Sequence, residues 1–150
     1  MAANRIILNE TTYFGPGSRS VLADEVKQRG FIKALVVTDK DLIKFKVTQL
    51  VLDVLDHAGI LYDIYDEVKP NPTVENVQNG ILALKASQAD FLVAVGGGSS
   101  IDTAKAMSLI ATNPEFADVR SLEGFGLTKH APMPLIAIPT TAGTASEVTT

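Results

Sequence analysis

The sequence predicts an α/β fold in which helices cover both faces of a parallel sheet. Three short apolar runs, residues 34–38, 91–95 and 135–138, have the length and the β-branched composition of strands. Their apolar character is continuous rather than alternating, which indicates that both faces of each strand are buried. Helix-periodic stretches separate the runs, and this alternation is typical of a Rossmann-like sheet with right-handed crossovers.

Two further segments are predicted at the margins of this sheet. Residues 62–66 mix polar and apolar side chains, which predicts a weaker strand at an edge. Residues 6–8 are apolar and can pair with residues 12–14, which predicts a peripheral hairpin near the N-terminus.

Four helices are predicted between the strands, and most have a recognisable beginning or end. Serine and threonine hydroxyls can cap a helix N-terminus, and glycine adopts the left-handed conformation that often ends a helix. The predicted helices span residues 18–29, begun by Ser18 and ended by Gly30; 42–58, ended by Gly59; 73–84, begun by Thr73; and 99–111, begun by Ser99 and ended by Asn113 and Pro114.

Composition limits the classes of function. The chain has 150 residues, 46% of them hydrophobic, which suits one folded domain with a sizeable core. The net charge of −4 argues against a nucleic-acid surface, and the absence of cysteine excludes disulfides and a thiol nucleophile. The sequence starts without a secretory signal pattern, and its apolar runs are far shorter than the ~20 residues of a membrane span. We expect a cytoplasmic protein with no nucleic-acid or membrane partner.

The strongest motif for chemistry is the run of three glycines that joins the strand at 91–95 to the next helix. Glycine lets the backbone bend sharply and approach a ligand, and a helix N-terminus presents free N–H groups and positive dipole charge. Gly97, Gly98 and Ser99 therefore predict a pyrophosphate cradle, with Ser99 and Asp102 forming a capping box. The alternative is a tight turn without a ligand. Neither the Gly-x-Gly-x-x-Gly fingerprint nor a Walker loop is present, which disfavours NTP hydrolysis.

A second loop of small residues follows the strand at 135–138. Thr140, Thr141 and Thr144 offer uncharged hydroxyl donors to a phosphate or ribose, and Thr144 with Glu147 has the spacing of a capping box that begins a helix. The alternative is a threonine-rich connector. The carboxyl ends of parallel strands meet at the edge where α/β folds bind ligands, which favours a binding role for both loops.

Two polar residues follow the other predicted strands. Asp39 can accept hydrogen bonds from both hydroxyls of an adenosine ribose, and its charge repels a 2′-phosphate, which implies NAD over NADP. The alternative is an N-cap for the helix that follows. Asn71, fixed between two prolines, is predicted to point at the same edge, or to be part of a rigid turn. His57 and His130 lie far apart and are assigned to no site.

In combination, three motifs resemble the iron-dependent (group III) alcohol dehydrogenases. They are residues 70–73, residues 96–105 and residues 139–147, and the resemblance extends over residues 5–150. Residues 113–124 resemble one member of that family in particular. Ser100 departs from the pattern, because family members commonly have proline there.

The resemblance implies an N-terminal domain that binds NAD and a C-terminal helical domain that binds a divalent metal, iron or possibly zinc. It further implies a small alcohol or aldehyde substrate and a homodimer. The family's metal ligands, one Asp and three His, have no match here, so no catalytic or metal-binding residue is assigned. The cofactor-binding residues that the resemblance implies are Asp39, Asn71, Gly97, Gly98, Ser99, Asp102, Thr140, Thr141, Gly143 and Thr144.

We therefore expect residues 1–150 to be a dinucleotide-binding domain, truncated from a longer enzyme and inactive alone. The chain stops a few residues after Thr144 and Glu147 begin the last predicted helix, and so short a helix is not stable alone. The alternatives are a non-catalytic dinucleotide-binding module, an inert fragment, and the cofactor domain of another family member such as a 1,3-propanediol or a general alcohol dehydrogenase.

Overall fold

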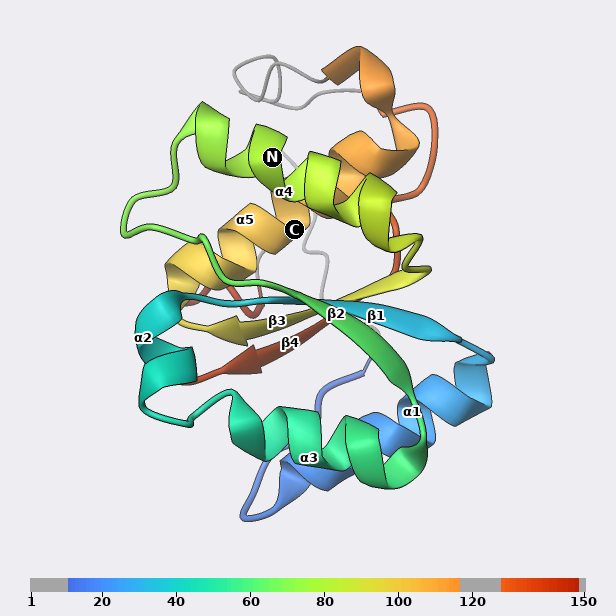
Figure 1. Ribbon diagram of the computed structural model, residues 1–150, viewed down its shortest axis with the longest axis vertical. Coiled ribbons are helices and arrows are strands. Elements are labelled where there is room, and N and C mark those ends of the chain that lie inside the picture. Colours follow the sequence, from blue (N-terminus) through green and yellow to red (C-terminus); the bar gives the residue numbers. More distant parts are fainter. Residues whose placement is uncertain (1–10, 117–127, 149–150) are drawn as a thin grey trace, which may run out of the picture.

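The protein is described by a computed structural model that covers residues 11–116 and 128–148. Its centre is a four-stranded parallel sheet in the order β2-β1-β3-β4 (Figure 1). The strands are β1 (Lys33–Val37), β2 (Leu61–Tyr65), β3 (Phe91–Gly96) and β4 (Leu135–Pro139). The predicted α/β fold with a parallel sheet is confirmed.

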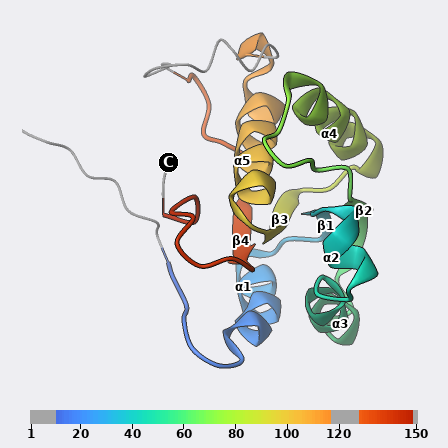
Figure 2. The same ribbon diagram turned by 90° about the vertical axis from the view of Figure 1, so that its left-hand side faces the viewer.

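Helices cover both faces of the sheet, as the sequence predicts (Figures 1 and 2). α1 and α3 pack on one face, and α4 and α5 pack on the other. The helices are η1 (Ser18–Ser20), α1 (Val21–Arg29), α2 (Lys40–Lys44), α3 (Gln49–Ala58), α4 (Val74–Ser87), α5 (Gly98–Thr112) and η2 (Pro114–Phe116).

The two central strands supply side chains to two separate cores. Along β1, Leu35 and Val37 face α4 and α5, whereas Ala34 and Val36 face α1 and α3. Successive strand residues point to opposite faces, so a continuously apolar strand fills both cores. Each fully buried Val or Leu side chain contributes about 1.5–3 kcal/mol through the hydrophobic effect.

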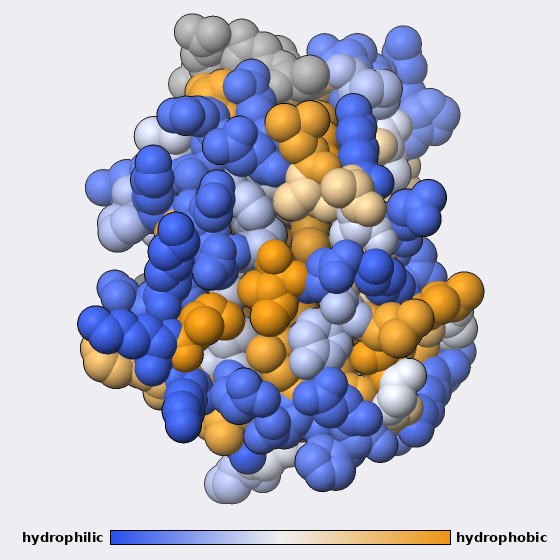
Figure 3. Space-filling model, in the orientation of Figure 1, coloured by the Kyte–Doolittle hydropathy of each residue, from blue (hydrophilic) through white to orange (hydrophobic). Residues whose placement is uncertain are grey.

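The outer strands are less buried than the central ones. β2 exposes Leu61 and Ile64, at 63% and 41%, and Figure 3 shows apolar surface in the region where β2 lies in Figure 1. The sequence therefore identified the edge strand. It also predicts that residues 135–138 are buried on both faces, but they are only half-buried, because β4 has β3 as its one strand neighbour in the described part of the chain.

Several predicted boundaries are confirmed and others are corrected. Gly30 and Gly59 end α1 and α3 in the left-handed conformation, with φ of 72° and 68°. Ser18 does not cap α1; it lies in a 3-10 turn without a side-chain cap. The helix predicted over 42–58 is two helices, because Lys46 has a φ of 60° between them.

The predicted N-terminal hairpin is not present in the described residues. Residues 12–14 form no strand, and their predicted partner, residues 6–8, lies outside the described part. Tyr13 instead donates a hydrogen bond from its hydroxyl to the Glu25 carboxylate over 2.6 Å. Within the described residues, no helix is long and apolar enough to cross a membrane.

Candidate functional site

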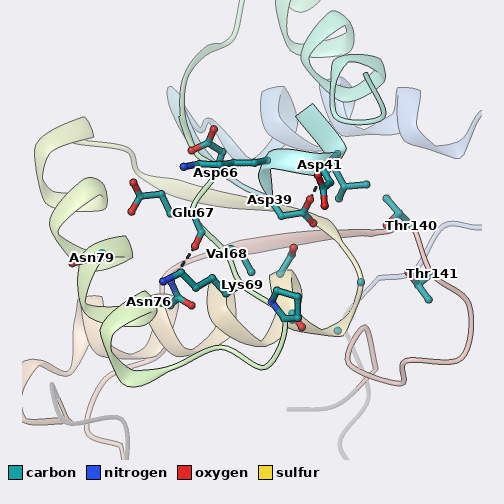
Figure 4. A pocket seen from close by; sticks show the side chains of 17 residues that line it. Asp39, Asp41, Asp66, Glu67, Val68, Lys69, Asn76, Asn79, Thr140 and Thr141 are labelled. Atoms are coloured by element: carbon teal, nitrogen blue, oxygen red, sulfur yellow. Dashed lines mark hydrogen bonds between the residues drawn. The ribbon is translucent and has the colours of Figure 1, made fainter. Parts of the chain in front are cut away.

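A cavity of about 770 Å³ lies where the carboxyl ends of all four strands meet (Figure 4). In Figure 4, Thr140 and Thr141 lie on one side of this cavity, and Glu67 and Asn76 lie on the other. The lining residues come from the segments after each strand, from the first two turns of α4 and from the first turn of α5: Asp39, Lys40, Asp41, Leu42, Asp66, Glu67, Val68, Lys69, Pro70, Asn76, Asn79, Gly97, Gly98, Ser99, Ser100, Thr140 and Thr141.

The three-glycine turn leads directly from β3 into α5 and leaves the helix N-terminus without a side-chain cap. Gly97 is the N-cap residue, and α5 begins at Gly98. The predicted capping box of Ser99 and Asp102 is therefore wrong, because Ser99 already lies within the helix. An uncapped N-terminus leaves backbone N–H groups available to an anion.

Neighbouring atoms leave little room for a side chain in this turn. A Cβ atom on Gly97 would lie 3.1 Å from Thr141 Oγ1, and one on Gly98 would lie 3.1 Å from Ser146 Oγ. Gly96 has a φ of 153°, which few other residues adopt. The glycines therefore let the segment after β4 pack against the start of α5.

The segment after β4, which we call the threonine loop (residues 140–147), does not begin a helix in the described part of the chain. The predicted Thr144–Glu147 capping box is wrong for a physical reason. Gly143 and Ala145 have φ values of 79° and 59°, so the backbone cannot continue into a right-handed helix. The Thr144 hydroxyl donates its hydrogen bond to the Glu147 carboxylate, which lowers the pKa of Glu147.

Asp39 caps a helix and also lines the cavity. Its Oδ1 atom accepts a hydrogen bond from the Leu42 backbone N–H over 2.9 Å, at the start of α2. The N-cap alternative is therefore confirmed. Because this bond uses one carboxylate oxygen, the cap does not prevent the other oxygen from contacting a ligand in the cavity.

Asn71 does not reach the cavity in this structure. It is exposed, has a φ of 54°, and is absent from the cavity lining. Asn76, which lies in the first turn of α4, lines the cavity instead. Its Nδ2 atom donates to the Glu67 carbonyl over 3.0 Å, and its buried Oδ1 atom has no partner. No sequence motif marks Asn76, because only the packing of α4 against the end of β2 places it there.

Asp102, Gly143 and Thr144 also lie outside the cavity lining. A Cβ atom on Gly98 would be 3.6 Å from the Thr144 Cβ and 4.0 Å from an Asp102 carboxylate oxygen. Asp102 and Thr144 therefore lie beside the glycine turn, next to the cavity rather than in its wall.

Charge divides the cavity into two sides. The ends of β1 and β2 contribute four carboxylates and two lysines, whereas the ends of β3 and β4 contribute only glycine, serine and threonine. Carboxylates repel phosphate but accept hydrogen bonds from hydroxyl groups, and free backbone N–H groups bind phosphate. The first side suits the hydroxyl groups of a ligand and the second suits its phosphate groups, a division that fits a nucleoside diphosphate.

No group of three or more His, Asp or Glu residues that could hold a metal ion occurs among residues 11–116 and 128–148.

Comparison with known proteins decides the family. Residues 9–150 match the sequence profile of the iron-containing alcohol dehydrogenases. The chain belongs to this family. It is 56% identical over 147 residues to lactaldehyde reductase from Escherichia coli K12, a match that covers 98% of this chain but 38% of the relative.

Solved structures of family members have the same fold. The alcohol dehydrogenase from Oenococcus oeni superposes with a TM-score of 0.91 at 36% identity, over 98% of this chain and 38% of that one. The sulfoacetaldehyde reductase from Bifidobacterium kashiwanohense, solved in complex with NAD+, superposes with a TM-score of 0.83 at 28% identity, over 99% of this chain and 39% of that one. The chain thus spans less than half the length of the relatives it matches.

Proposed function

We propose that residues 1–150 are the dinucleotide-binding domain of an NAD-dependent, metal-dependent alcohol dehydrogenase. In the complete protein, this enzyme interconverts lactaldehyde and 1,2-propanediol by hydride transfer in the cytoplasm, as a homodimer. The observation that carries the proposal is the uncapped N-terminus of α5 at Gly97 and Gly98, which faces the cavity. The identity to lactaldehyde reductase supports the choice of substrate.

Each side of the cavity receives one part of NAD in this proposal. The backbone N–H groups of Gly98 and Ser99 bind the pyrophosphate, assisted by the hydroxyls of Thr140 and Thr141. Asp39 accepts a hydrogen bond from the adenosine ribose with the carboxylate oxygen that does not cap α2.

The remaining predicted contacts extend the site toward the nicotinamide. By the family resemblance, Asp102 lies near the nicotinamide end and Thr144 on the phosphate and nicotinamide side, with Gly143 as a further cofactor contact; Asp102 and Thr144 both lie beside Gly98. Asn71 contacts the cofactor only if the segment after β2 turns inward on binding.

Hydride transfer needs groups that the described residues do not supply. When bound, the nicotinamide accepts or donates the hydride, and a metal polarises the substrate oxygen. We therefore expect the 150-residue chain to be inactive alone and to bind NADH weakly or not at all. The complete protein should bind NADH and oxidise 1,2-propanediol.

Two measurements test this function. NADH titration by calorimetry should give tight binding to the complete protein only, and tight binding to the 150-residue chain would show that the site is complete without further residues. Activity with 1,2-propanediol should exceed activity with 1,3-propanediol. The reverse order would favour the 1,3-propanediol dehydrogenases, to which this chain is 39% identical in Klebsiella pneumoniae.

Replacing Asp39 with Asn separates its two roles. Asparagine can still accept the hydrogen bond from the Leu42 N–H, so α2 keeps its cap. The loss of negative charge should lower the ratio of kcat/KM for NAD to kcat/KM for NADP by about tenfold. This change corresponds to about 1.4 kcal/mol of transition-state free energy. An unchanged NAD/NADP preference in a variant of unchanged thermal stability would remove the ribose role.

A further inference from the structure

Lys105 lies on the same face of α5 as two residues of the proposed cofactor site. Gly98, Asp102 and Lys105 are separated by four and three positions, so they follow one another along one side of the helix. The threonine loop packs along this side. It contacts the Gly98 position through Ser146 and Thr144, and further along the helix the Lys105 ammonium donates a hydrogen bond to the Ser146 carbonyl.

The threonine loop is attached to the fold near both of its ends. At its start, the Thr140 N–H donates to the Gly96 carbonyl over 2.9 Å. Residues 141–145 make no backbone hydrogen bond to another element of the described structure. The bond from Lys105 therefore attaches the far end of the loop to α5, while the bond from Thr140 attaches its start to the end of β3.

The environment of Lys105 indicates that this contact is specific. Lys105 is half-buried, and burial lowers the pKa of its ammonium, whereas Asp102 and Glu147 favour the charged form. A partly buried ammonium is stable only where acceptors and opposite charges compensate it. Here they come from α5 and from the threonine loop, so the lysine joins the two elements. A hydrogen bond from a charged donor is about twice as strong as a neutral one.

We propose that Lys105 is a positioning residue that holds the threonine loop against the start of α5 and thereby sets the phosphate-binding side of the cavity. It touches neither substrate nor cofactor. Thr140 and Thr141 line the cavity at the near end of the loop, and Thr144 lies beside Gly98. Releasing the far end lets these hydroxyls move away from the glycine turn. This inference rests on the proposed function, since it takes NAD as the ligand.

The test compares Lys105→Met with Lys105→Arg in the complete protein. Methionine keeps the length of the side chain but removes the donor and the charge, whereas arginine keeps both. Lys85→Met is the matched control, because Lys85 is an exposed lysine on the neighbouring helix α4. The measurements are NADH affinity by fluorescence titration, KM for NAD and kcat, and hydrogen exchange of the backbone amides of residues 141–148.

Lys105→Met should weaken NADH binding about tenfold, the effect of losing one hydrogen bond to a charged group. KM for NAD should rise more than kcat falls, and amide exchange should accelerate in residues 141–148 but not in β3 or α4. Lys105→Arg should recover most of the affinity, and Lys85→Met should change nothing. If Lys105 contributed only to stability, Lys105→Met would lower the melting temperature without a selective increase of amide exchange in residues 141–148.

Unchanged affinity and unchanged exchange in Lys105→Met would overturn the proposal and leave the proposed function intact. If the wild-type protein does not bind NADH, the proposed function fails. The exchange data then still decide whether Lys105 holds the loop. If Lys105→Met does not fold, Lys105→Ala, which also removes the donor, replaces it. Affinity and exchange equal to wild type in Lys105→Ala would contradict the proposal.

Discussion

The loops that follow β3 and β4 are alike in sequence but differ in structure. Each follows an apolar strand, each consists of small residues, and the sequence predicts a helix after both. The glycine turn enters α5 at once, whereas the threonine loop bends through left-handed Gly143 and Ala145 and forms no helix in the described residues. The first loop depends on its own backbone conformation. The second depends on contacts with α5, at Gly98 and Lys105.

The largest expected effect comes from disrupting the glycine turn where the two loops meet. Gly98→Val places a branched side chain where even a Cβ atom would be 3.1 Å from Ser146 Oγ. The threonine loop must then move away, and the N-terminus of α5 is obstructed. We expect NADH affinity in the complete protein to fall by at least about 100-fold, measured by calorimetry.

Gly30→Asn is the matched control for this variant. Gly30 has a positive φ, and no atom lies within 4 Å of its Cβ position, so asparagine is tolerated there. Its NADH affinity should equal that of the wild type. Wild-type affinity in Gly98→Val would mean that the two loops do not form one site.

A smaller effect tests one of the contacts between the two loops, the one between Gly97 and Thr141. Gly97→Ala brings a methyl group to 3.1 Å from Thr141 Oγ1, a contact that forces a small displacement. We expect about a tenfold loss of NADH affinity. The double variant with Thr141→Ala should restore part of it, because the clashing hydroxyl is gone. If the losses of NADH affinity in the two single variants simply add in the double variant, Gly97→Ala acts through the backbone conformation and not through contact with the Thr141 hydroxyl.

The smallest effect concerns the internal bond of the threonine loop and its pH dependence. The Thr144 hydroxyl lowers the pKa of Glu147 below its ordinary value of 4.5. A lowered folded-state pKa contributes stability above pH 4.5, and this contribution is lost as pH falls through the folded pKa. Thr144→Val should therefore be less stable than wild type at pH 7, and the difference should shrink as the pH falls below 4.5, in urea unfolding of the complete protein.

We expect this variant to bind NADH only a few-fold more weakly, since Lys105 still holds the loop. A stability difference that stays unchanged as the pH falls below 4.5 would assign the effect of Thr144 to packing rather than to the Glu147 carboxylate.

The features that the sequence predicted correctly are those with a local cause. The apolar runs of β1 and β3 identify buried strands, because each strand must fill two cores. Gly30 and Gly59 mark helix ends because few other residues adopt a positive φ readily. The cofactor-binding residues stay predictions, although six of the ten line one cavity because the carboxyl ends of parallel strands meet: Asp39, Gly97, Gly98, Ser99, Thr140 and Thr141.

The features that sequence reasoning missed depend on contacts between distant segments. The capping-box spacing at Thr144 and Glu147 predicts a helix, but α5 holds this segment in another conformation. Asn76 reaches the cavity through its bond to Glu67, and Lys105 reaches Ser146 across 41 positions of sequence. No local pattern encodes such pairs.

By itself, the sequence determined the class of fold, the order of its four strands along the chain, and the glycine turn, because strand periodicity and glycine conformation act over a few residues. Only the tertiary structure decided which polar groups face the cavity, how charge divides it, and how the threonine loop is held. Those properties arise where β3, β4 and α5 come together, and they depend on the packing of side chains that are distant in sequence.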